Sequence, residues 1–423
     1  MTQRHRVLRE LEAMREEAVA FAAELVRIPT INPPGDAYED CARVIGERLR
    51  TGGFEVEYLA AEGSPEHTPR HPRLNVIGTR DGIARGPVLH LNGHLDVVPA
   101  GGGWTVEPFA GIVRNGRLYG RGSCDMKAGL AAAVAAAEAI RRAGVSLAGT
   151  LEISGTVDEE SGGSAGVAWL ARQGRVAASR TDYVIIPEPL GVDRVCIGHR
   201  GVYWFEVVVR GRTAHGSMPF LGVSAIDHMA ALLEALRSEL LPKLTSRVTR
   251  MPVVPAAAAR ATLNVNAVVG GQATDAVQSP CVADRCRAVF DRRFLVEERF
   301  EAVRAEVVEL LERLRARLTD FRYELNDLMV VHPVQAPESS PLVSALQRNV
   351  REVLGGEAPL VASPGTYDQK HFARIAGVEH CVAYGPGNLE LAHQPDEWCG
   401  IDDLVAATKV IALTALDLGG RNT

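Results

Sequence analysis

An apolar run that ends in an imidazole and a carboxylate sets the strongest limit on how this chain can fold. The run is Leu91-Asn-Gly-His-Leu-Asp-Val-Val-Pro99, in which His94 and Asp96 are two residues apart. Side chains alternate along a strand, so both groups are predicted to point to the same side of a sheet. A histidine that binds a metal usually needs a polar partner to orient its ring, and Asp96 is the candidate for that role.

Length, charge and cysteine content describe a globular protein with more than one core. A chain of 423 residues is too long for one ordinary core, so we expect two domains. The net charge of −6 gives no reason to expect nucleic acid or an anionic membrane as a partner. The first 25 residues lack the layout of a signal peptide, and no apolar run reaches about 18 residues. Seven scattered cysteines without a CxxC pair predict free thiols and a cytoplasmic location.

Strand-like runs alternate with helical patterns over the first 198 residues. Helical periodicity covers residues 6–27, 38–51, 126–142 and 165–173, and the strand-like runs cover residues 54–59, 74–78, 88–95, 151–156 and 183–186. This alternation predicts an α/β layered domain with a mostly parallel sheet.

The pattern changes near Gly198 and returns to the first type after residue 331. Between these points the sequence predicts a strand at 203–210, a helix at 224–241, strands at 261–269 and 284–294, a helix at 297–318 and a strand at 322–331. This β-α-β-β-α-β order is typical of a ferredoxin-like α+β domain. We therefore expect one α/β domain of residues 1–198 and 332–423, interrupted by a small α+β domain of residues 199–331, which the resemblance described below implies is a lid or dimerisation domain inserted in a catalytic domain.

Five acidic or imidazole side chains stand where apolar runs give way to loops, and together they form a predicted ligand set. They are His94, Asp125, Glu160, Glu188 and His393. Two imidazoles and three carboxylates suit two divalent ions, zinc first, with manganese or cobalt as alternatives. One carboxylate can bridge the ions. Our hypothesis is that Asp125 does so, because its glycine-flanked loop, Gly122-Ser-Cys-Asp-Met-Lys-Ala-Gly129, could place it centrally.

The acidic triplet Asp158-Glu-Glu160 predicts a catalytic base beside the metal ligands. Three adjacent acids in an apolar setting are costly unless a cation neutralises them. One of the two glutamates can bind metal, while the other stays free to take a proton from the attacking water. We assign Glu160 to the metal and Glu159 to the base.

Each motif also has an alternative interpretation. A lone Asp-Glu-Glu is usually a solvated turn, and a lone histidine at a strand end is usually structural. The string Gly162-Gly-Ser-Ala-Gly166 fits the nucleophile-elbow pattern, so a serine esterase would use Ser164. His90 and His94 have the spacing of a helical zinc site, but their surroundings are strand-like, which favours a structural His90. A catalytically silent metal-binding or interaction protein is a further alternative.

Taken together, the motifs resemble the co-catalytic metallohydrolases that include acetylornithine deacetylase, succinyl-diaminopimelate desuccinylase, aminoacylase-1 and carboxypeptidase G. The strings that carry the resemblance are Gly93-His-Leu-Asp96, Gly122-Ser-Cys-Asp-Met-Lys127, Asp158-Glu-Glu160 and Pro187-Glu188. The resemblance implies two zinc ions, Asp96 positioning His94 and Glu159 as the base. It also implies an interrupted α/β catalytic domain with a lid.

The resemblance extends to two residues of the inserted domain. Gly211-Arg-Thr-Ala-His-Gly-Ser-Met-Pro219 is similar to a segment that supplies a histidine, here His215, to polarise the scissile carbonyl. In dimeric relatives that histidine crosses to the partner's active site, so a homodimer through the lid is expected. Asp291-Arg-Arg293 resembles a strand whose arginine, here Arg293, clamps a substrate carboxylate. A locally bonded loop histidine and a surface salt bridge are the respective alternatives.

One departure bears on the substrate. Relatives often carry Asn-Val-Val-Pro before that strand, whereas this chain has Pro280-Cys-Val-Ala283 and lacks the amide side chain. The expected function is metal-dependent cleavage of an amide-like C–N bond in a small carboxylate-bearing substrate, of the deacylase, aminoacylase or carboxypeptidase type. The alternative is removal of a carbamoyl group or an amine, for example from an aromatic amino acid such as an aminobenzoate. A serine esterase using Ser164 is the third interpretation.

Overall fold

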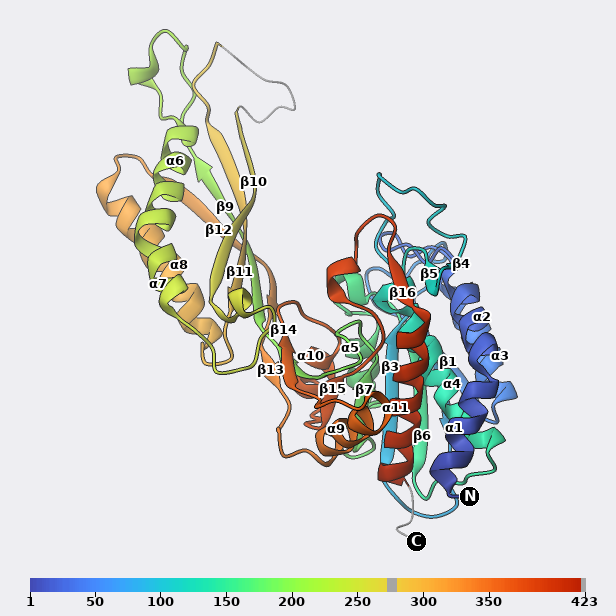
Figure 1. Ribbon diagram of the computed structural model, residues 1–423. Coiled ribbons are helices and arrows are strands. Elements are labelled where there is room, and N and C mark those ends of the chain that lie inside the picture. Colours follow the sequence, from blue (N-terminus) through green and yellow to red (C-terminus); the bar gives the residue numbers. More distant parts are fainter. Residues whose placement is uncertain (272–279, 420–423) are drawn as a thin grey trace. The chain divides into compact units, whose positions relative to one another are not determined.

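The computed structural model describes residues 1–271 and 280–419 and divides into two compact units (Figure 1). The first unit comprises Met1–Gly198, Ala336–Val361 and Tyr367–Thr423, and the second comprises His199–Gln335 and Ala362–Thr366. None of the helices within the described ranges is long and apolar enough to cross a bilayer.

Strands and helices alternate along the first unit. Its helices are α1 (Gln3–Ala13), α2 (Arg15–Val26), α3 (Tyr38–Thr51), α4 (Ala128–Arg142), α5 (Val167–Arg172), α9 (Pro341–Leu354), α10 (Gln369–Arg374) and α11 (Ile401–Gly419). Its strands, including two at its borders, are β1 (Glu55–Ala60), β2 (Leu74–Arg80), β3 (Val88–His94), β4 (Ile112–Arg114), β5 (Arg117–Tyr119), β6 (Thr150–Thr156), β7 (Tyr183–Ile186), β8 (Val195–His199), β14 (Leu360–Ser363), β15 (Cys381–Ala383) and β16 (Trp398–Gly400). Three short turns complete it: η1 (Ser123–Lys127), η2 (Glu159–Ser161) and η6 (Leu389–Leu391).

The main sheet of the first unit has parallel strands at its centre and antiparallel strands at its borders. Within this unit the strand order is β1-β2-β6-β3-β7-β15-β8. Strand β3 runs parallel to β6 and β7, and β7 runs parallel to β15. The pairs β1–β2, β2–β6 and β15–β8 are antiparallel. The predicted α/β fold is therefore confirmed, and the carboxyl ends of β6, β3 and β7 meet at one edge of the sheet.

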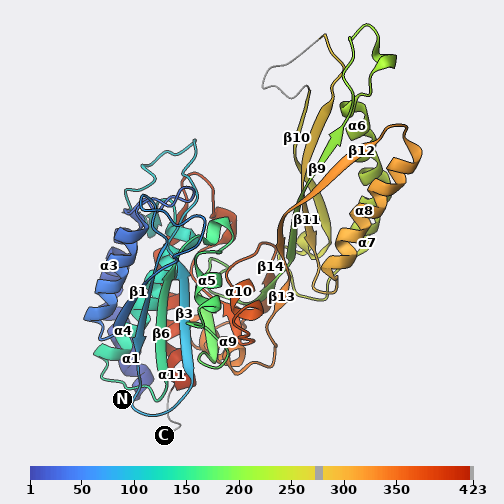
Figure 2. The same ribbon diagram turned by 180° about the vertical axis from the view of Figure 1, so that it is seen from behind.

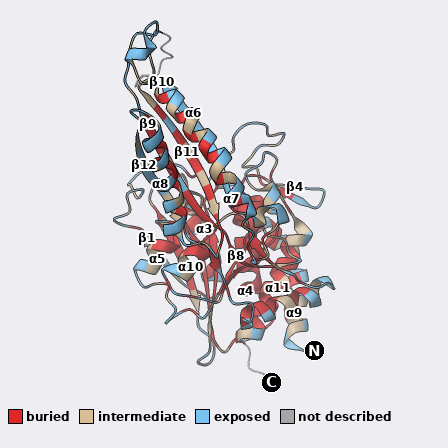
Figure 3. Ribbon diagram, turned by 90° about the vertical axis from the view of Figure 1, so that its left-hand side faces the viewer, coloured by how far each residue is buried: buried red, intermediate tan, exposed pale blue. Residues whose placement is uncertain are grey.

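Helices cover both faces of this sheet, and the two faces differ in polarity (Figures 1 and 2). On one face, α3, α4 and α11 bury aliphatic side chains, and the close approach of α4 requires a glycine at position 93. A Cβ at Gly93 would lie 3.2 Å from Leu130 Cβ of α4, tighter than most real contacts. The other face carries buried polar side chains, including His90, whose ring packs edge-on against Phe372 of α10. Figure 3 shows how completely α4 and α11 are buried.

The second unit is an antiparallel sheet backed by helices. Its elements are β9 (Gly201–Arg210), η3 (Pro219–Leu221), α6 (Ala225–Ala235), η4 (Leu236–Leu240), α7 (Leu241–Ser246), η5 (Ala256–Ala259), β10 (Thr262–Gly271), β11 (Arg285–Phe294), α8 (Phe300–Arg317), β12 (Arg322–Val331) and β13 (Val334–Gln335). The strand order β10-β11-β9-β12 is the ferredoxin-like arrangement that the sequence predicts. Stacked rings of Phe205 and Phe290, with centroids 4.8 Å apart, lie in its core.

Several predicted helices differ in their limits, including those expected at 165–173 and 297–318, which are observed as α5 and α8. The helix expected at residues 6–27 is broken at Met14, so that α1 and α2 can each pack against α4. The helix expected at 224–241 continues to Ser246 through the π-type turn η4. Helix α4 begins at Ala128, two residues later than predicted, because Asp125 and Met126 have non-helical backbone angles.

Candidate metal centre

Three neighbouring parallel strands bring three of the predicted ligands to the same edge of the sheet. His94 is the last residue of β3, Glu160 lies in η2 directly after β6, and Glu188 follows β7. Sites in α/β proteins form outside the carboxyl ends of parallel strands, and this edge follows that rule. The other two predicted ligands come from loops: Asp125 lies in η1 before α4, and His393 follows η6.

All five side chains converge around Asp125. Nε2 of His94 is 3.1 Å from Asp125 Oδ1 and 3.9 Å from Glu188 Oε1. Nε2 of His393 is 3.4 Å from Asp125 Oδ2 and 3.1 Å from Glu160 Oε2. Asp125 therefore lies between the two imidazoles and turns one oxygen toward each. The four residues other than His393 have side chains no more than 11% exposed, whereas the His393 side chain is 50% exposed.

The electrostatics of the five side chains favour the binding of a cation among them. Burial and the neighbouring Asp125 raise the pKa of Glu188 well above its usual value and raise the pKa of Glu160 to about 7. Hydrogen bonds to Asp125 and Glu160 raise the pKa of His393 to about 10. Burial also raises the pKa of Asp125, but hydrogen bonds from His393 and His94 outweigh it and lower that pKa overall. Carboxylates packed this closely with imidazoles form a donor set that fits divalent cations such as zinc.

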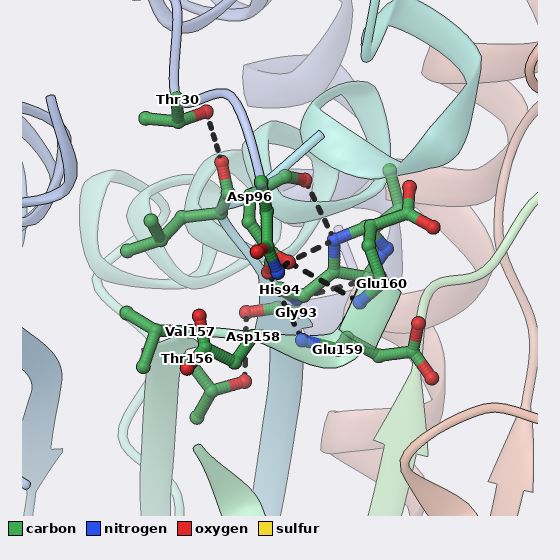
Figure 4. Close-up of polar contacts among 12 residues, drawn as sticks. Thr30, Gly93, His94, Asp96, Thr156, Val157, Asp158, Glu159 and Glu160 are labelled. Atoms are coloured by element: carbon green, nitrogen blue, oxygen red, sulfur yellow. Dashed lines mark hydrogen bonds and ion pairs between the residues drawn. The ribbon is translucent and has the colours of Figure 1, made fainter. Parts of the chain in front are cut away.

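Asp96 lies close to the imidazole of His94 and also connects β3 to the acidic loop (Figure 4). Strand β3 ends at His94, so the alternation expected from the sequence stops before Asp96. Nδ1 of His94 is 2.9 Å from the backbone carbonyl oxygen of Asp96 and 3.7 Å from its carboxylate. The Asp96 carboxylate instead accepts hydrogen bonds from the backbone N–H groups of Glu159 and Glu160, each at 3.2 Å, and from Asn32. It thereby fixes the loop that carries the predicted base.

The carboxylate of Glu159 forms an ion pair with a buried lysine. Nζ of Lys370, a residue of α10, is 2.8 Å from Glu159 Oε1, and the two side chains are 5% and 10% exposed. Burial lowers the pKa of Lys370, but the charges of Glu159 and Asp368 outweigh it and raise that pKa overall. Asp368 is itself buried, which raises its pKa to about 7. Sequence reasoning missed Lys370 and Asp368. The only signal was an acid and an amine two residues apart in Tyr367-Asp-Gln-Lys370.

The first acid of the triplet is neutralised by the protein itself. Asp158 accepts hydrogen bonds from Tyr38 Oη and from Arg73 Nε, each at 2.9 Å, and all three side chains are buried. Its backbone is left-handed, with φ of 62°, a conformation that costs energy for a residue other than glycine. The cation that neutralises Asp158 is therefore the guanidinium of Arg73 and not a metal ion.

The two other motifs considered in the sequence have structural explanations. His90 is buried on β3, with Nε2 2.7 Å from Ser154 Oγ and Nδ1 3.3 Å from Glu152. Ser164 is exposed, eight residues beyond the end of β6, and η2 intervenes. A nucleophile elbow needs a sharp turn directly from strand to helix, so this geometry disfavours a serine nucleophile.

His215 and Arg293 belong to the second unit. His215 is exposed, and its Nδ1 is 2.7 Å from Ser217 Oγ. Arg293 makes two hydrogen bonds to the carboxylate of Asp291, at 2.8 and 3.0 Å. The segment Pro280–Ala283, which lacks the amide side chain of relatives, lies beside the loop of His215. The carbonyl of Pro280 accepts a hydrogen bond from the N–H of Gly216 at 2.6 Å.

Comparisons with known proteins identify the family and the fold. The profile of peptidase family M20/M25/M40 matches residues 90–417, which include all five predicted ligands. A succinyl-diaminopimelate desuccinylase from Methylobacterium radiotolerans is 29% identical over 404 residues, which are 93% of this chain and 95% of that protein. The fold is shared with the dipeptidase Dug1p of Saccharomyces cerevisiae, with a TM-score of 0.80, 16% identity and full coverage of both chains. It is also shared with a dinuclear metal-binding peptidase of family M20 from Bacillus subtilis, with a TM-score of 0.68, 17% identity, and coverage of 96% of this chain and 99% of that chain.

Proposed function

Since this chain belongs to peptidase family M20/M25/M40, as its motifs predict, and is a hydrolase of C–N bonds, we propose that it uses two divalent metal ions to cleave an amide-like bond in a small carboxylate-bearing substrate. The observation that carries the proposal is the convergence of five predicted ligands around Asp125 at one sheet edge.

The donor set divides into two groups that share one carboxylate. His94 and Glu188 would hold one ion, His393 and Glu160 would hold the other, and Asp125 would bridge them. Zinc fits two imidazoles and three carboxylates best, with manganese or cobalt as alternatives. When bound, such ions act as Lewis acids and lower the pKa of coordinated water toward neutrality.

Glu159 is the general base of the proposed mechanism. Its carboxylate bonds to Lys370 instead of joining the ligand cluster, so it stays free of the metal, and the Asp96 contacts hold its loop in place. Glu159 accepts a proton from the attacking water and then donates it to the leaving nitrogen. In this proposal two adjacent residues of one turn have different roles: Glu160 binds metal, and Glu159 transfers the proton.

The second unit supplies the residues proposed to recognise the substrate. His215 polarises the scissile carbonyl, and Arg293 binds the substrate carboxylate through its planar guanidinium. The two hydrogen bonds from Asp291 fix the orientation of that guanidinium. Curated relatives named for removal of a succinyl group from diaminopimelate support an N-acyl amino acid as the substrate class.

A substrate panel on the metal-loaded protein tests the proposed activity. We expect N-succinyl or N-acetyl amino acids to be hydrolysed with a kcat/KM at least ~10-fold above that for dipeptides, because a deacylase discriminates through its acyl pocket. The panel also contains carbamoyl amino acids and aminobenzoates, and product amines are quantified by chromatography. Chelator-resistant hydrolysis of esters that disappears in Ser164→Ala would instead establish the serine esterase.

The same site could remove a carbamoyl group or an amine, and one observation favours keeping this alternative. The segment Pro280–Ala283 lacks the amide side chain that often helps to seat the acyl amino acid in relatives, and it lies against the His215 loop. Turnover of carbamoyl amino acids or aminobenzoates alone in the panel would replace the deacylase with this alternative.

We also propose a homodimer that forms through the second unit. Strand β10 is one of the two terminal strands of its sheet in the described residues, so its outer edge is available for pairing. Three of its valines, Val265, Val268 and Val269, are between 42% and 56% exposed. A second copy of the chain that pairs along β10 would cover both the edge and these side chains.

Mixed dimers of His215→Ala and Glu159→Gln chains test whether His215 acts on the partner. Each homodimer should be inactive. A verified heterodimer should be active, because one of its two sites would then combine an intact Glu159 with the partner's intact histidine. Activity of tandem-tagged, affinity-purified heterodimers is measured, with unmixed variants as controls. An inactive heterodimer would show that His215 serves its own chain, and an active His215→Ala homodimer would show that it has no catalytic role.

A further inference from the structure

A buried ion pair contacts the loop of the predicted bridging ligand. Arg121 and Glu397 are 2% and 1% exposed, and Nη1 of Arg121 bonds to Oε2 of Glu397. The other carboxylate oxygen of Glu397 accepts from the backbone N–H groups of Cys124 at 2.8 Å and Asp125 at 3.1 Å. These contacts fix the backbone of η1 at the residue that lies between the two imidazoles.

The same arginine holds the loop of His393. Nη2 of Arg121 donates to the carbonyl of His393, and Nη1 donates to the carbonyl of Gln394, each at 3.3 Å. Nη2 also donates to the carbonyl of Ala100, and the guanidinium carbon lies 5.2 Å from the centre of the Trp104 ring. Arg121 thus donates hydrogen bonds to the loop of His393, while Glu397 accepts hydrogen bonds from the loop of Asp125.

The His393 loop needs such support because its backbone is strained. His393 and Asp396 both have left-handed backbone angles, with φ of 63° and 55°, which persist only where the surroundings enforce them. Asp396 is anchored separately, through hydrogen bonds from the N–H and the hydroxyl of Thr105. The His393 side chain is half exposed, and its Nε2 contacts the carboxylates of Asp125 and Glu160.

We propose that the Arg121–Glu397 pair is a positioning device that sets the distance between Asp125 and His393, and so prepares the metal site that these two residues share. This inference rests on the proposed metal-binding function. Neither residue of the pair is a ligand: both act through the backbone of the loops that carry the ligands. Residues that orient metal ligands in this way typically contribute 10- to 100-fold to metal affinity.

Metal affinity of the full-length protein is the direct readout. Wild type, Glu397→Gln and Arg121→Met are stripped of metal and titrated with Zn²⁺ alone against a chromophoric chelator. We expect wild type to bind two ions and both variants to bind one of them at least ~10-fold more weakly. His393→Ala identifies the affected site, because it removes a ligand of the same ion, and both variants should weaken the site that His393→Ala weakens.

Glu152→Gln is the matched control. Glu152 is also buried and pairs with an arginine, Arg175, at 2.8 Å, but it contacts neither ligand loop. It should lower the melting temperature like the other variants while both metal affinities stay at the wild-type values. If Arg121→Met fails to fold, Glu397→Gln decides the question, since it keeps the size of the side chain and an acceptor for the two N–H groups.

The possible outcomes separate this inference from the proposed function. Wild-type protein that takes up no metal would overturn the proposed function. Wild type that binds two ions, together with unchanged affinities in Glu397→Gln, would overturn the positioning role alone. An equal loss of affinity in Glu152→Gln would also overturn it, because general destabilisation would then explain the result.

Discussion

Replacing Glu159 by Gln should lower kcat by about 1,000-fold while both metal sites remain loaded. Glutamine keeps the size of the side chain and an oxygen that can accept from Lys370, but it cannot take up a proton. The carboxylate of Glu159 bonds to Lys370 at 2.8 Å and is not one of the five predicted ligands, so the metal content should not change. Steady-state kinetics on the preferred substrate, with elemental analysis of the same preparation, measures both quantities.

The control for this prediction is a glutamate with similar surroundings but no part in the site. The side chain of Glu152 is 7% exposed, compared with 10% for Glu159, and it is paired with the partly buried Arg175. Glu152→Gln should lower the melting temperature and leave kcat close to the wild-type value. A base that acts only in the transition state predicts equal losses in kcat and kcat/KM for Glu159→Gln. Near-normal turnover by Glu159→Gln would remove Glu159 from the mechanism.

The metal-free protein should lose stability as the pH rises from 4.5 through about 7. Burial and the charge of Asp125 raise the pKa of Glu160 from its ordinary 4.5 to about 7 and raise the pKa of Glu188 in the same direction. A carboxyl whose pKa is raised by folding favours the folded state fully below its unfolded pKa. That contribution is lost as the pH rises through the folded pKa. Thermal unfolding followed at pH 5 and pH 7.5 measures the effect.

Adding metal should reverse this loss and do so more strongly at the higher pH. Metal ligands must be deprotonated, so binding competes with protons on Glu160 and the imidazoles and tightens as the pH rises. An ion at 100 times its Kd stabilises the folded state by about 2.7 kcal/mol for each site. We therefore expect the melting temperature to rise by several degrees with zinc at pH 7.5 and by much less at pH 5.

Asp125→Asn provides the control for the metal effect, because it removes the charge that both groups of ligands share. Zinc should raise the melting temperature of this variant far less than that of wild type at pH 7.5. A melting temperature of wild type that does not respond to zinc at either pH would contradict the metal centre. An equal response at both pH values would contradict the protonation argument for Glu160 and Glu188.

The predicted ligands could be found from the sequence because each follows a short apolar run. His94 ends a largely buried strand, Glu160 and Glu188 follow two others within four residues, and parallel strands place their carboxyl ends together. Local patterns of this kind indicate a shared edge even when the strand order is unknown. The ferredoxin-like order of the second unit was equally visible, since it depends only on the succession of strands and helices.

The residues that support the ligands could not be found in this way. Lys370 reaches Glu159 from a helix that begins 210 residues later in the chain, and no sequence spacing relates them. Glu397 and Arg121 are likewise far apart in sequence, although each lies within four residues of a predicted ligand. Which residues form such pairs depends on which loops pack together at the edge of the sheet. The same holds for Arg73, which neutralises Asp158 from the start of a different strand.

The contacts of Asp96 could be predicted only in part from its neighbours in the sequence. The period of two along a strand predicts its side chain beside His94, and the carboxylate does lie 3.7 Å from Nδ1 of His94, although β3 ends at His94. The Asp96 carboxylate then meets two free N–H groups at η2, which offer a buried carboxylate better hydrogen bonds than a single imidazole does. Where a strand ends depends on its neighbours in the sheet, so the sequence pattern could not reveal that the Asp96 carboxylate accepts hydrogen bonds from these N–H groups.

By itself, the sequence determined the succession of strands and helices, the family and the chemical nature of the predicted ligands. These properties follow from hydrophobic periodicity and from side chains that are close in the chain. The tertiary structure alone decided that Asp125 lies between two imidazoles, that Lys370 pairs with Glu159, and that an arginine and a glutamate join two loops. Contacts of this kind depend on which distant segments the packed core brings within about 3 Å, the range of a hydrogen bond.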